Sequence, residues 1–371
     1  MAPPTTTTTT AELAPKPRQY FGEGKTLPIH LDGELKNNNG VLEVTGETNV
    51  SYPKYLPVWD TNLNYEPLTE FEHEEPGLRA DPSFPNLLKD GVIASDITPK
   101  FGTEIRGIQL SSLDDKGKDE LALYVAQRGV VAFREQDFAE LPISEALDYG
   151  RHFGRLHIHP SSGAPKDYPE IHLVHRTASQ KKPVFFDYHT SSVQWHTDVS
   201  YEKQPPGTTF LYLLDGPESG GDTIFSDQVE AYERLSDGFK SRLSGLKAVH
   251  SGYEQYQDAL AQNHHVRRAP VANEHPLVRT HPATGKKALY VNEQFTRSIV
   301  GFKKEESDAI LNFLYDHNAK GVDFQARVKW EPRTVVVWDN RRALHSALYD
   351  WDSNQRRHMA RVTPQAEVPR E

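Results

Sequence analysis

The stretch Arg333–Asp339 reads RTVVVWD, and Thr208–Leu214 reads TTFLYLL. Both are short runs of β-branched and aromatic residues, which is typical of buried strands. Gly129–Arg134 (GVVAFR) and Met359–Thr363 have the same character, whereas Glu305–Asn318 spaces its apolar residues as an amphipathic helix does. Short strands with helices between them predict an α+β domain built on an antiparallel β-sandwich or barrel.

The composition excludes several classes of protein. The 371-residue chain has no cysteine, so it has no disulfide framework, thiolate zinc site, iron–sulfur cluster or thiol nucleophile. With 52 acidic against 42 basic residues its net charge is −10, which argues against nucleic acid as a partner. Neither a GxGxxG nor a P-loop sequence is present, so nucleotide-binding folds gain no support. Any metal chemistry must use His, Asp and Glu.

No segment has the pattern of a membrane anchor. Apolar runs such as Thr334–Trp338 are far shorter than the ~20 residues that a spanning helix needs. Met1–Thr10 lacks the basic and then apolar order of a signal peptide. We therefore expect a cytoplasmic protein without a membrane partner, and we also expect a homo-oligomer.

Residues 1–95 differ from the rest of the chain. Thr5–Thr10 is a homopolymer, Asn37–Asn39 is a polar tract, and prolines recur. Such segments bury too little apolar surface to form a core alone. We predict that 1–20 is disordered, that 21–95 is an irregular extension lying on the main domain, and that 96–371 is that domain. The expected docking residues are Tyr52, Tyr55, Leu56, Trp59 and Tyr65.

The segment Trp195–Asp198 (WHTD) is a candidate metal site. Residues two apart on a strand point to the same face, so His196 and Asp198 are able to offer a nitrogen and an oxygen to one ion. A second histidine would complete a 2-His-1-carboxylate triad, which leaves three coordination positions open. The pattern alone is weak, because His30–Asp32 (HLD) repeats it in the extension, where a surface role is expected.

The surrounding sequence strengthens this interpretation. Gly220–Thr223 (GGDT) lies downstream, followed by Trp338–Arg341 (WDNR), His345 and Gln355–Arg361 (QRRHMAR). A buried arginine holds a carboxylate with two parallel hydrogen bonds, and a threonine hydroxyl adds a donor. A site with His, Asp, His, Arg and Thr is what a dicarboxylate that chelates a divalent metal would require.

Residues 102–364 resemble the taurine dioxygenase family of Fe(II)- and 2-oxoglutarate-dependent oxygenases, and most of all its fungal sulfonate dioxygenase branch. The matching segments are GRLHIHP (154–160), WHTDVSYEKQPPG (195–207), ESGGDTIFSD (218–227), KKALYVNEQFTRSIVGF (286–302) and VVVWDNRRALHSALYDWDSNQRRHMAR (335–361). The resemblance implies a double-stranded β-helix core (jelly-roll, cupin-like) with flanking helices. It also implies Fe(II), 2-oxoglutarate as cosubstrate, and O₂.

The resemblance assigns roles position by position. It implies that His196, Asp198 and His345 are the iron ligands and that Thr223 and Arg357 bind 2-oxoglutarate. It also implies that Arg361 and His159 bind the sulfonate of the substrate. The residues that match the walls of the substrate pocket are Val199, Tyr201 and Phe295. Arg356 competes with Arg357, because the twelve residues from His345 to Arg357 are one more than in the bacterial taurine enzyme. We favour Arg357, since strand alternation puts Arg356 on the opposite face.

The expected substrate is a small anion. Ser162 and Ser192 replace the tyrosine and asparagine near the substrate amine in the taurine enzyme, so an alkyl sulfonate other than taurine is favoured. Hydroxylation at the carbon next to sulfur would release sulfite and an aldehyde, with succinate and CO₂. The alternatives are an alkyl sulfate ester, xanthine or an aryloxyalkanoate, and, in another class, a non-catalytic metal-binding jelly-roll protein.

Some residues near these motifs have plainer interpretations. We predict that His157 is structural and that Trp195 and Trp338 are core residues. We expect an exposed loop, and a potential lid over the site, at His264, His265, Arg267 and Arg268.

Overall fold

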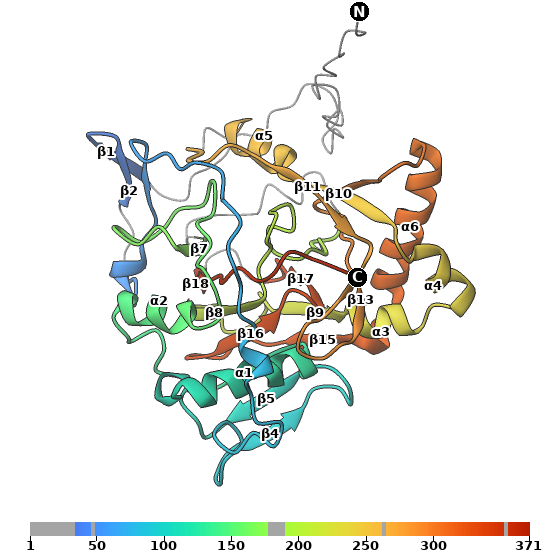
Figure 1. Ribbon diagram of the computed structural model, residues 1–371. Helices are drawn as coiled ribbons and strands as arrows, with labels where there is room; N and C mark the ends of the chain where they lie inside the picture. The colour runs from blue at the N-terminus through green and yellow to red at the C-terminus, as the bar shows by residue number, and fades with distance from the viewer. Residues whose placement is uncertain (1–33, 46–48, 177–189, 262–264, 352–354) are drawn as a thin grey trace, which may run out of the picture.

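The computed structural model describes residues 34–45, 49–176, 190–261, 265–351 and 355–371 (Figure 1). The chain is an α+β protein in which sheets form the centre and helices flank them. Within the described residues, no helix is both long and apolar enough to span a membrane.

A seven-stranded sheet carries the core, in the order β4-β5-β6-β16-β8-β18-β7. Its strands are β4 (Ile93–Asp96), β5 (Thr103–Arg106), β6 (Val130–Phe133), β16 (Val335–Asp339), β8 (Thr208–Asp215), β18 (Arg357–Val362) and β7 (Ile171–Arg176). All neighbours pair antiparallel except β5 and β6, which are parallel. The strand runs expected from the sequence are thus confirmed, and they lie together in one sheet.

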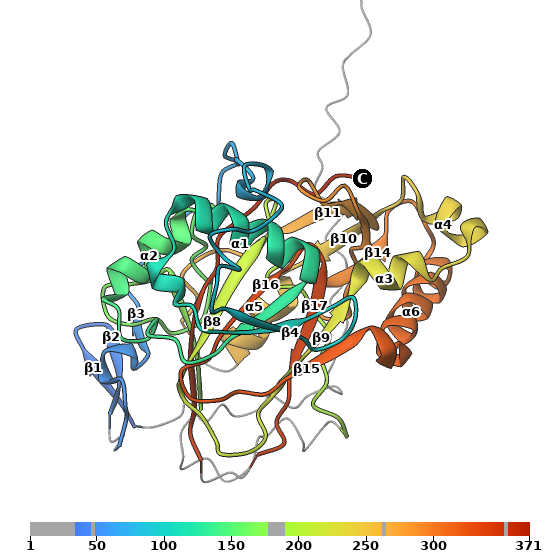
Figure 2. The same cartoon turned by 90° about the horizontal axis from the view of Figure 1, so that it is seen from below.

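The alternation of side chains along β16 explains why this sheet is covered on both faces. Val335 and Val337 pack in the apolar cluster beneath α1 (Asp115–Arg128) and α2 (Ile143–Arg151). Val336 and Trp338 pack in a second cluster on the opposite face. In Figure 2 α1 and α2 lie along one side of the sheet.

A three-stranded sheet covers that second face. Its order is β15-β9-β17, with β15 at Gln325–Val328, β9 at Thr223–Asp227 and β17 at Ala343–Ala347. Phe225 of β9 and Met359 of β18 share the apolar cluster between the two sheets with Trp338. The two sheets therefore form a sandwich, and residues of β9, β17 and β18 face the space between them.

A further layer closes one end of the sandwich. It contains α3 (Gln228–Glu233), α4 (Asp237–Leu243), α5 (Tyr253–Ala261) and α6 (Lys304–Lys320), the sheet β11 (Ala272–Pro276)-β10 (Lys247–Ser251)-β14 (Thr296–Ile299), and the pair β12 (Val278–Thr280) and β13 (Lys287–Leu289). The helix expected at 305–318 is confirmed as α6. An apolar cluster joins α3, α4 and α6 to these strands.

The N-terminal extension is more regular than the sequence suggested. Its strands β1 (Glu34–Asn38), β2 (Val41–Thr45) and β3 (Val58–Asp60) form an antiparallel sheet. Asn39 and Gly40 both have positive φ angles, 52° and 89°, so the polar tract is a hairpin turn. The Asn-Gly pair is a strong hairpin signal that the low-complexity interpretation overlooked. The predicted disorder of 1–20 lies outside the described residues.

Tyr55 anchors this extension to the main domain. It is fully buried, and its hydroxyl accepts a hydrogen bond from the hydroxyl of Tyr212 of β8, with 3.0 Å between the two oxygens. Tyr52 donates through its hydroxyl to Glu140 at 2.6 Å. Trp59 donates through Nε1 to the carbonyl of Ser161 at 3.3 Å. Three of the five expected docking residues, Tyr52, Tyr55 and Trp59, thus contact the main domain.

Candidate active site

Two histidines from distant parts of the chain are paired through their backbones. His345 lies in β17, and His196 forms an isolated antiparallel bridge with it. His196 N donates to His345 O at 3.1 Å, and His345 N donates to His196 O at 2.8 Å. The ring centroids lie 4.2 Å apart. β pairing therefore holds two imidazoles side by side.

Asp198 is positioned by a residue that the sequence analysis missed. Its backbone N–H donates to Oδ1 of Asn340 at 3.0 Å, and Nδ2 of Asn340 donates to Thr209 Oγ1 at 2.9 Å. Asn340 directly follows β16, so the central sheet fixes the chain at Asp198. Its place in the WDNR segment was the available signal.

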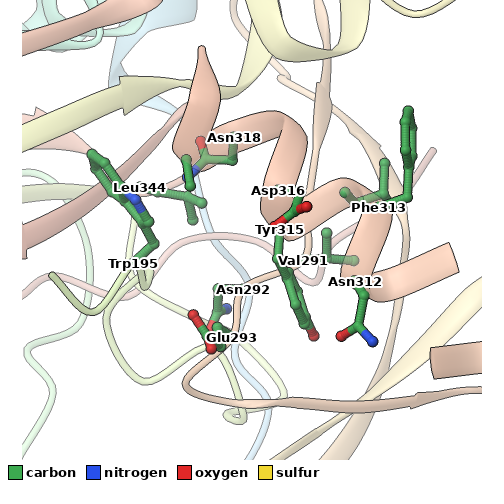
Figure 3. A pocket seen from close by; sticks show the side chains of 12 residues that line it. Trp195, Val291, Asn292, Glu293, Asn312, Phe313, Tyr315, Asp316, Asn318 and Leu344 are labelled. Atoms are coloured by element: carbon green, nitrogen blue, oxygen red, sulfur yellow. The ribbon is translucent and has the colours of Figure 1, made fainter. Parts of the chain in front are cut away.

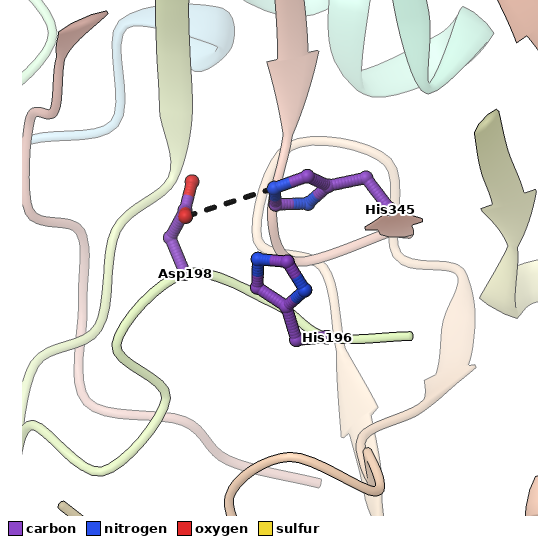
Figure 4. A group of neighbouring side chains, drawn as sticks. All are labelled: His196, Asp198 and His345. Atoms are coloured by element: carbon purple, nitrogen blue, oxygen red, sulfur yellow. Dashed lines mark ion pairs between the residues drawn. The ribbon is translucent and has the colours of Figure 1, made fainter. Parts of the chain in front are cut away.

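Together His196, Asp198 and His345 form a metal triad. One potential ligand atom of each lies within 4.8 Å of the others, and Figure 4 shows both rings and the carboxylate turned toward one another. His345 Nε2 lies 3.7 Å from Asp198 Oδ1. His196 donates through Nδ1 to the carbonyl of Gln194 at 2.9 Å, which leaves Nε2 with a lone pair for a metal.

The electrostatics of the metal triad suit a divalent cation. Burial lowers the pKa of both histidines, and His196 lowers that of His345 further. Burial opposes charge on Asp198, but Arg361 and the two histidines hold the pKa of its carboxyl below the ordinary value. Among the described residues Oδ2 of Asp198 is buried without a hydrogen-bond partner. One carboxylate and two neutral imidazoles are the donors of a facial iron triad.

A second group of potential ligands has a different character. His73, Glu75 and Glu367 also lie close together, but Nη1 of the buried Arg341 donates to both carboxylates. The guanidinium already neutralises these groups. Of the two groups that the described residues offer, only the metal triad has a carboxylate oxygen buried without a donor.

Arg361 of β18 lies against the metal triad. Its Nη1 donates to Oδ1 of Asp198, and its Nη2 donates to Nδ1 of His172 at 3.2 Å. The ring of His159 lies 4.5 Å from that of His172 between centroids. The two residues expected to bind a sulfonate, Arg361 and His159, are thus brought to the same side of the metal triad.

Arg357 faces the same space between the sheets. It is buried, and its Nε donates to the carbonyl of Gly221 at 3.1 Å, two residues before Thr223. Gly221 has a φ of 68°, and a Cβ there would lie 3.3 Å from Arg357, so glycine lets the turn close on the arginine. Burial lowers the pKa of Arg357 to about 10, and the guanidinium remains charged at neutral pH.

Arg356 points away from this space. Its Nη1 donates to the carbonyl of Asn49 at 2.8 Å and lies 3.7 Å from Asp215.

Thr223, at the start of β9, accepts a hydrogen bond from Trp330 Nε1 at 3.1 Å, which leaves its own hydroxyl proton for another acceptor. The geometry therefore favours Arg357 with Thr223 over Arg356.

The expectation of an exposed loop at Arg267 and Arg268 is wrong. Their exposed fractions are 7% and 3%. Arg268 donates to Glu202 at 2.6 Å, and His157 lies 2.9 Å from the same carboxylate oxygen. These buried charges are satisfied as an ion pair, which charge alone in a sequence cannot reveal. His157 is structural as predicted, and His264 lies outside the described residues.

Val199, Tyr201 and Phe295 form one small apolar cluster. The ring of Phe295 lies 5.1 Å from that of Tyr201 and 6.4 Å from that of His196. Val199 has a φ of 38°, which is strained for a β-branched residue and occurs next to the metal triad. The three expected wall residues therefore lie together beside His196.

Comparison with known proteins agrees with this arrangement. Residues 94–363 match the model of the taurine catabolism dioxygenase TauD, TfdA family. The chain belongs to the TauD/TfdA family. It is 51% identical over 355 residues to an alpha-ketoglutarate-dependent sulfonate dioxygenase of Saccharomyces cerevisiae, covering 94% of this chain and 84% of the relative.

Two further TauD/TfdA relatives are informative. A putative alpha-ketoglutarate-dependent sulfonate dioxygenase of Schizosaccharomyces pombe is 42% identical over 323 residues, covering 86% of this chain and 80% of the relative. The crystal structure of a putative alpha-ketoglutarate-dependent taurine dioxygenase from Burkholderia xenovorans has a TM-score of 0.61 at 30% identity, covering 75% of this chain and 94% of that chain. This TauD/TfdA protein is an Fe(II)-dependent dioxygenase that uses 2-oxoglutarate (alpha-ketoglutarate) and O₂.

A cavity of about 300 Å³ is lined in part by Trp195 and Leu344, the neighbours in sequence of His196 and His345 (Figure 3). Residues of α6 and 291–293 form most of its wall, with Trp195 and Leu344 at one side. Each of these two precedes a histidine of the metal triad, so alternation turns them to the opposite face. The cavity is therefore separate from the metal triad. Of the two tryptophans expected in the core, Trp195 lines this cavity and Trp338 lies in the core.

Proposed function

We propose that this dioxygenase hydroxylates an alkyl sulfonate at the carbon next to sulfur. The observation that carries the proposal is the contact between Arg361 and Asp198, because it puts an anion-binding guanidinium directly beside the metal triad. The two yeast relatives, one named a sulfonate dioxygenase and the other a putative sulfonate dioxygenase, support the same substrate class. One oxygen atom of O₂ becomes the new hydroxyl, and the other enters succinate as 2-oxoglutarate loses CO₂. The hydroxylated carbon then loses sulfite and becomes an aldehyde.

The proposed roles follow from the positions of the side chains. His196, Asp198 and His345 would hold Fe(II), which with 2-oxoglutarate supplies O₂ activation when bound. Arg357 and Thr223 would hold the distal carboxylate of 2-oxoglutarate, with two parallel hydrogen bonds from the guanidinium and one from the hydroxyl.

The substrate would be held by a separate set of side chains. Arg361 and His159 would bind its sulfonate, so that the adjoining carbon faces the metal. The cluster of Val199, Tyr201 and Phe295 would wall the pocket and exclude water from the reacting carbon.

We propose that the two facing sheets form a double-stranded β-helix. The arrangement of the strands supports this proposal. In the sandwich, Thr223 of β9 and His345 of β17 belong to one sheet, and Arg357 and Arg361 of β18 belong to the facing sheet. Residues 96–371 would be the catalytic domain and 1–95 its extension. A cytoplasmic location and a homo-oligomer stay predictions.

A panel of substrates tests the reaction, scored for succinate in the presence of Fe(II), 2-oxoglutarate and O₂. We expect alkyl sulfonates to give sulfite and succinate in equal amounts. An alkyl sulfate ester would instead release sulfate, xanthine would give uric acid, and an aryloxyalkanoate would give a phenol. Omission of 2-oxoglutarate is the control. Succinate formation with any of these other substrates but with no sulfonate would contradict the proposal.

A further inference from the structure

One histidine without a proposed role faces the anion-binding side of the metal triad. His172 lies on β7 directly opposite Arg361 of β18 in the antiparallel register. It accepts the hydrogen bond from Arg361 Nη2 at 3.2 Å, and its ring is in edge contact with that of His159. It also keeps part of its surface accessible. Three side chains from three segments thus meet at one point.

The hydrogen bonds of the two rings fix which nitrogen carries the proton. A guanidinium only donates, so Nδ1 of His172 must accept from Arg361 and its proton must be on Nε2. Nδ1 of His159 likewise accepts from the backbone N–H groups of Ser161, at 3.2 Å, and Ser162, at 3.1 Å. Burial and the charge of Arg361 lower the pKa of both rings, so both are neutral. Each ring therefore presents an Nε2–H donor.

Neighbouring residues hold this arrangement in place. The Ser162 hydroxyl lies 3.0 Å from Nδ1 of His172 and 3.5 Å from its Nε2. Arg267 donates to the carbonyls of His159, at 2.9 Å, and Ser162, at 2.6 Å, which ties the segment that carries both residues. Ser162 is one of the two positions, with Ser192, where the sequence departs from the taurine enzyme, and its hydroxyl lies beside His172.

We propose that His172 is a substrate-binding residue that joins Arg361 and His159 in a three-donor site for a tetrahedral sulfur oxyanion. The guanidinium supplies the charge, and the two neutral imidazoles add directed N–H groups without adding repulsion between cations. A sulfonate or sulfate head group has three oxygens to meet three donors, whereas a planar carboxylate has two and leaves one donor unpaired. The inference rests on the proposed function and adds the means by which the site selects its head group.

Binding measurements on the complete chain test the proposal. Protein loaded with Fe(II) and 2-oxoglutarate without O₂ would be titrated by calorimetry with an alkanesulfonate, the alkyl sulfate and the alkanecarboxylate of equal chain length. We compare wild type with His172→Phe, which keeps a ring but removes both nitrogens, and with His172→Gln, which restores an N–H donor. His175→Phe is the matched control, since His175 lies on the same strand but packs against His358.

The expected result is a change of selectivity. His172→Phe should weaken sulfonate binding by about tenfold and carboxylate binding by less than about threefold, because one hydrogen bond to an anion is lost. His172→Gln should recover part of the loss, and His175→Phe should keep the wild-type preference. Tighter binding of the sulfate than of the sulfonate would assign the site to sulfate esters.

Other results would overturn the proposal. Equal weakening of all three anions by His172→Phe would mean that the ring only supports Arg361, and unchanged binding would mean that it has no role. A wild type that binds none of the anions would overturn this inference as well. Sulfonate binding that depends on His172 but leads to no sulfite under O₂ would keep the inference and contradict the proposed function.

Discussion

The guanidinium of Arg361 donates a hydrogen bond to the carboxylate of Asp198. Asp198 accepts this bond through Oδ1, and its Oδ2 is buried without a partner among the described residues. One arginine thus joins the metal triad to the anion-binding side of the site. A substrate held by Arg361 is necessarily close to the metal, which is what selective hydroxylation of the carbon next to an anionic head group requires.

The metal triad is tested by His345→Ala. We expect metal affinity to fall on the order of 100-fold or more and turnover to be lost, because two donors do not replace three. Iron content after dialysis and succinate release are the measurements. His317→Ala is the control, since His317 Nε2 pairs with the carbonyl of Ala231 away from the metal triad.

The count of bound iron also tests the second group of potential ligands. We expect wild type to bind one iron per chain, because Arg341 neutralises Glu75 and Glu367. A His345→Ala protein that still binds one iron and turns over substrate would show that the metal triad is wrongly assigned.

Substitution distinguishes Arg357, the first residue of β18, from Arg356, which directly precedes the strand. Arg357→Ala should raise the KM for 2-oxoglutarate on the order of 100-fold, since a bidentate charge-assisted pair is lost. Arg356→Ala, one residue earlier, should leave it within about twofold, because Arg356 contacts Asn49 and Asp215 instead. Succinate release at varied 2-oxoglutarate measures both. The reverse pattern would mean that the register of β18 carries the other arginine into the site.

Much of this could be predicted from the sequence, for identifiable reasons. The strands were visible because the β-branched and aromatic runs Thr208–Leu214 and Val335–Asp339 are buried on both faces. His196 and Asp198 were visible because the metal chemistry imposes a local spacing. His345 and Arg357 came through the resemblance, since no local pattern joins them to the WHTD segment.

Contacts between distant residues escaped the sequence analysis. Asn340 hydrogen-bonds to Asp198, and His172 hydrogen-bonds to Arg361, and both partners are far away in the chain. Nothing in the local sequence distinguishes either residue from an ordinary polar one. Arg268 is buried because it forms an ion pair with Glu202. No spacing in the sequence predicts that partner, so Arg268 was expected to be exposed. Burial of a charge is decided by its partner.

The two anion-binding arginines differ in the ligand that they hold. Arg361→Ala should raise the KM for the sulfonate on the order of 100-fold and that for 2-oxoglutarate by less than about threefold, because Arg361 lies beside Asp198 and His172 rather than Gly221. Arg361→Lys should recover part of the loss, since it keeps the charge but not the fork. Equal increases for both ligands would mean that the roles of Arg357 and Arg361 are confused.

Buried His358 gives the stability of the fold a pH dependence between pH 6.5 and 3. Burial, and then the neighbouring His175, lower the pKa of His358 to about 3 from 6.5, and its Nε2 lies 3.0 Å from the carbonyl of Tyr55 in the extension. The unfolded chain binds this proton below pH 6.5 and the folded protein does not until about pH 3. Stability is therefore complete above pH 6.5 and falls as the pH drops toward 3.

His358→Gln should remove this contribution, because glutamine keeps an N–H for Tyr55 but does not titrate. Between pH 7.5 and pH 5 we expect wild type to lose about 2 kcal/mol more free energy of unfolding than the variant. Urea unfolding at the two pH values measures the difference. The carboxyls of Glu202 and Glu367, whose pKa values are lowered to about 2, change their contribution only below pH 4.5 and cancel in this comparison. Parallel losses in both proteins would mean that His358 is already protonated in the fold at pH 5.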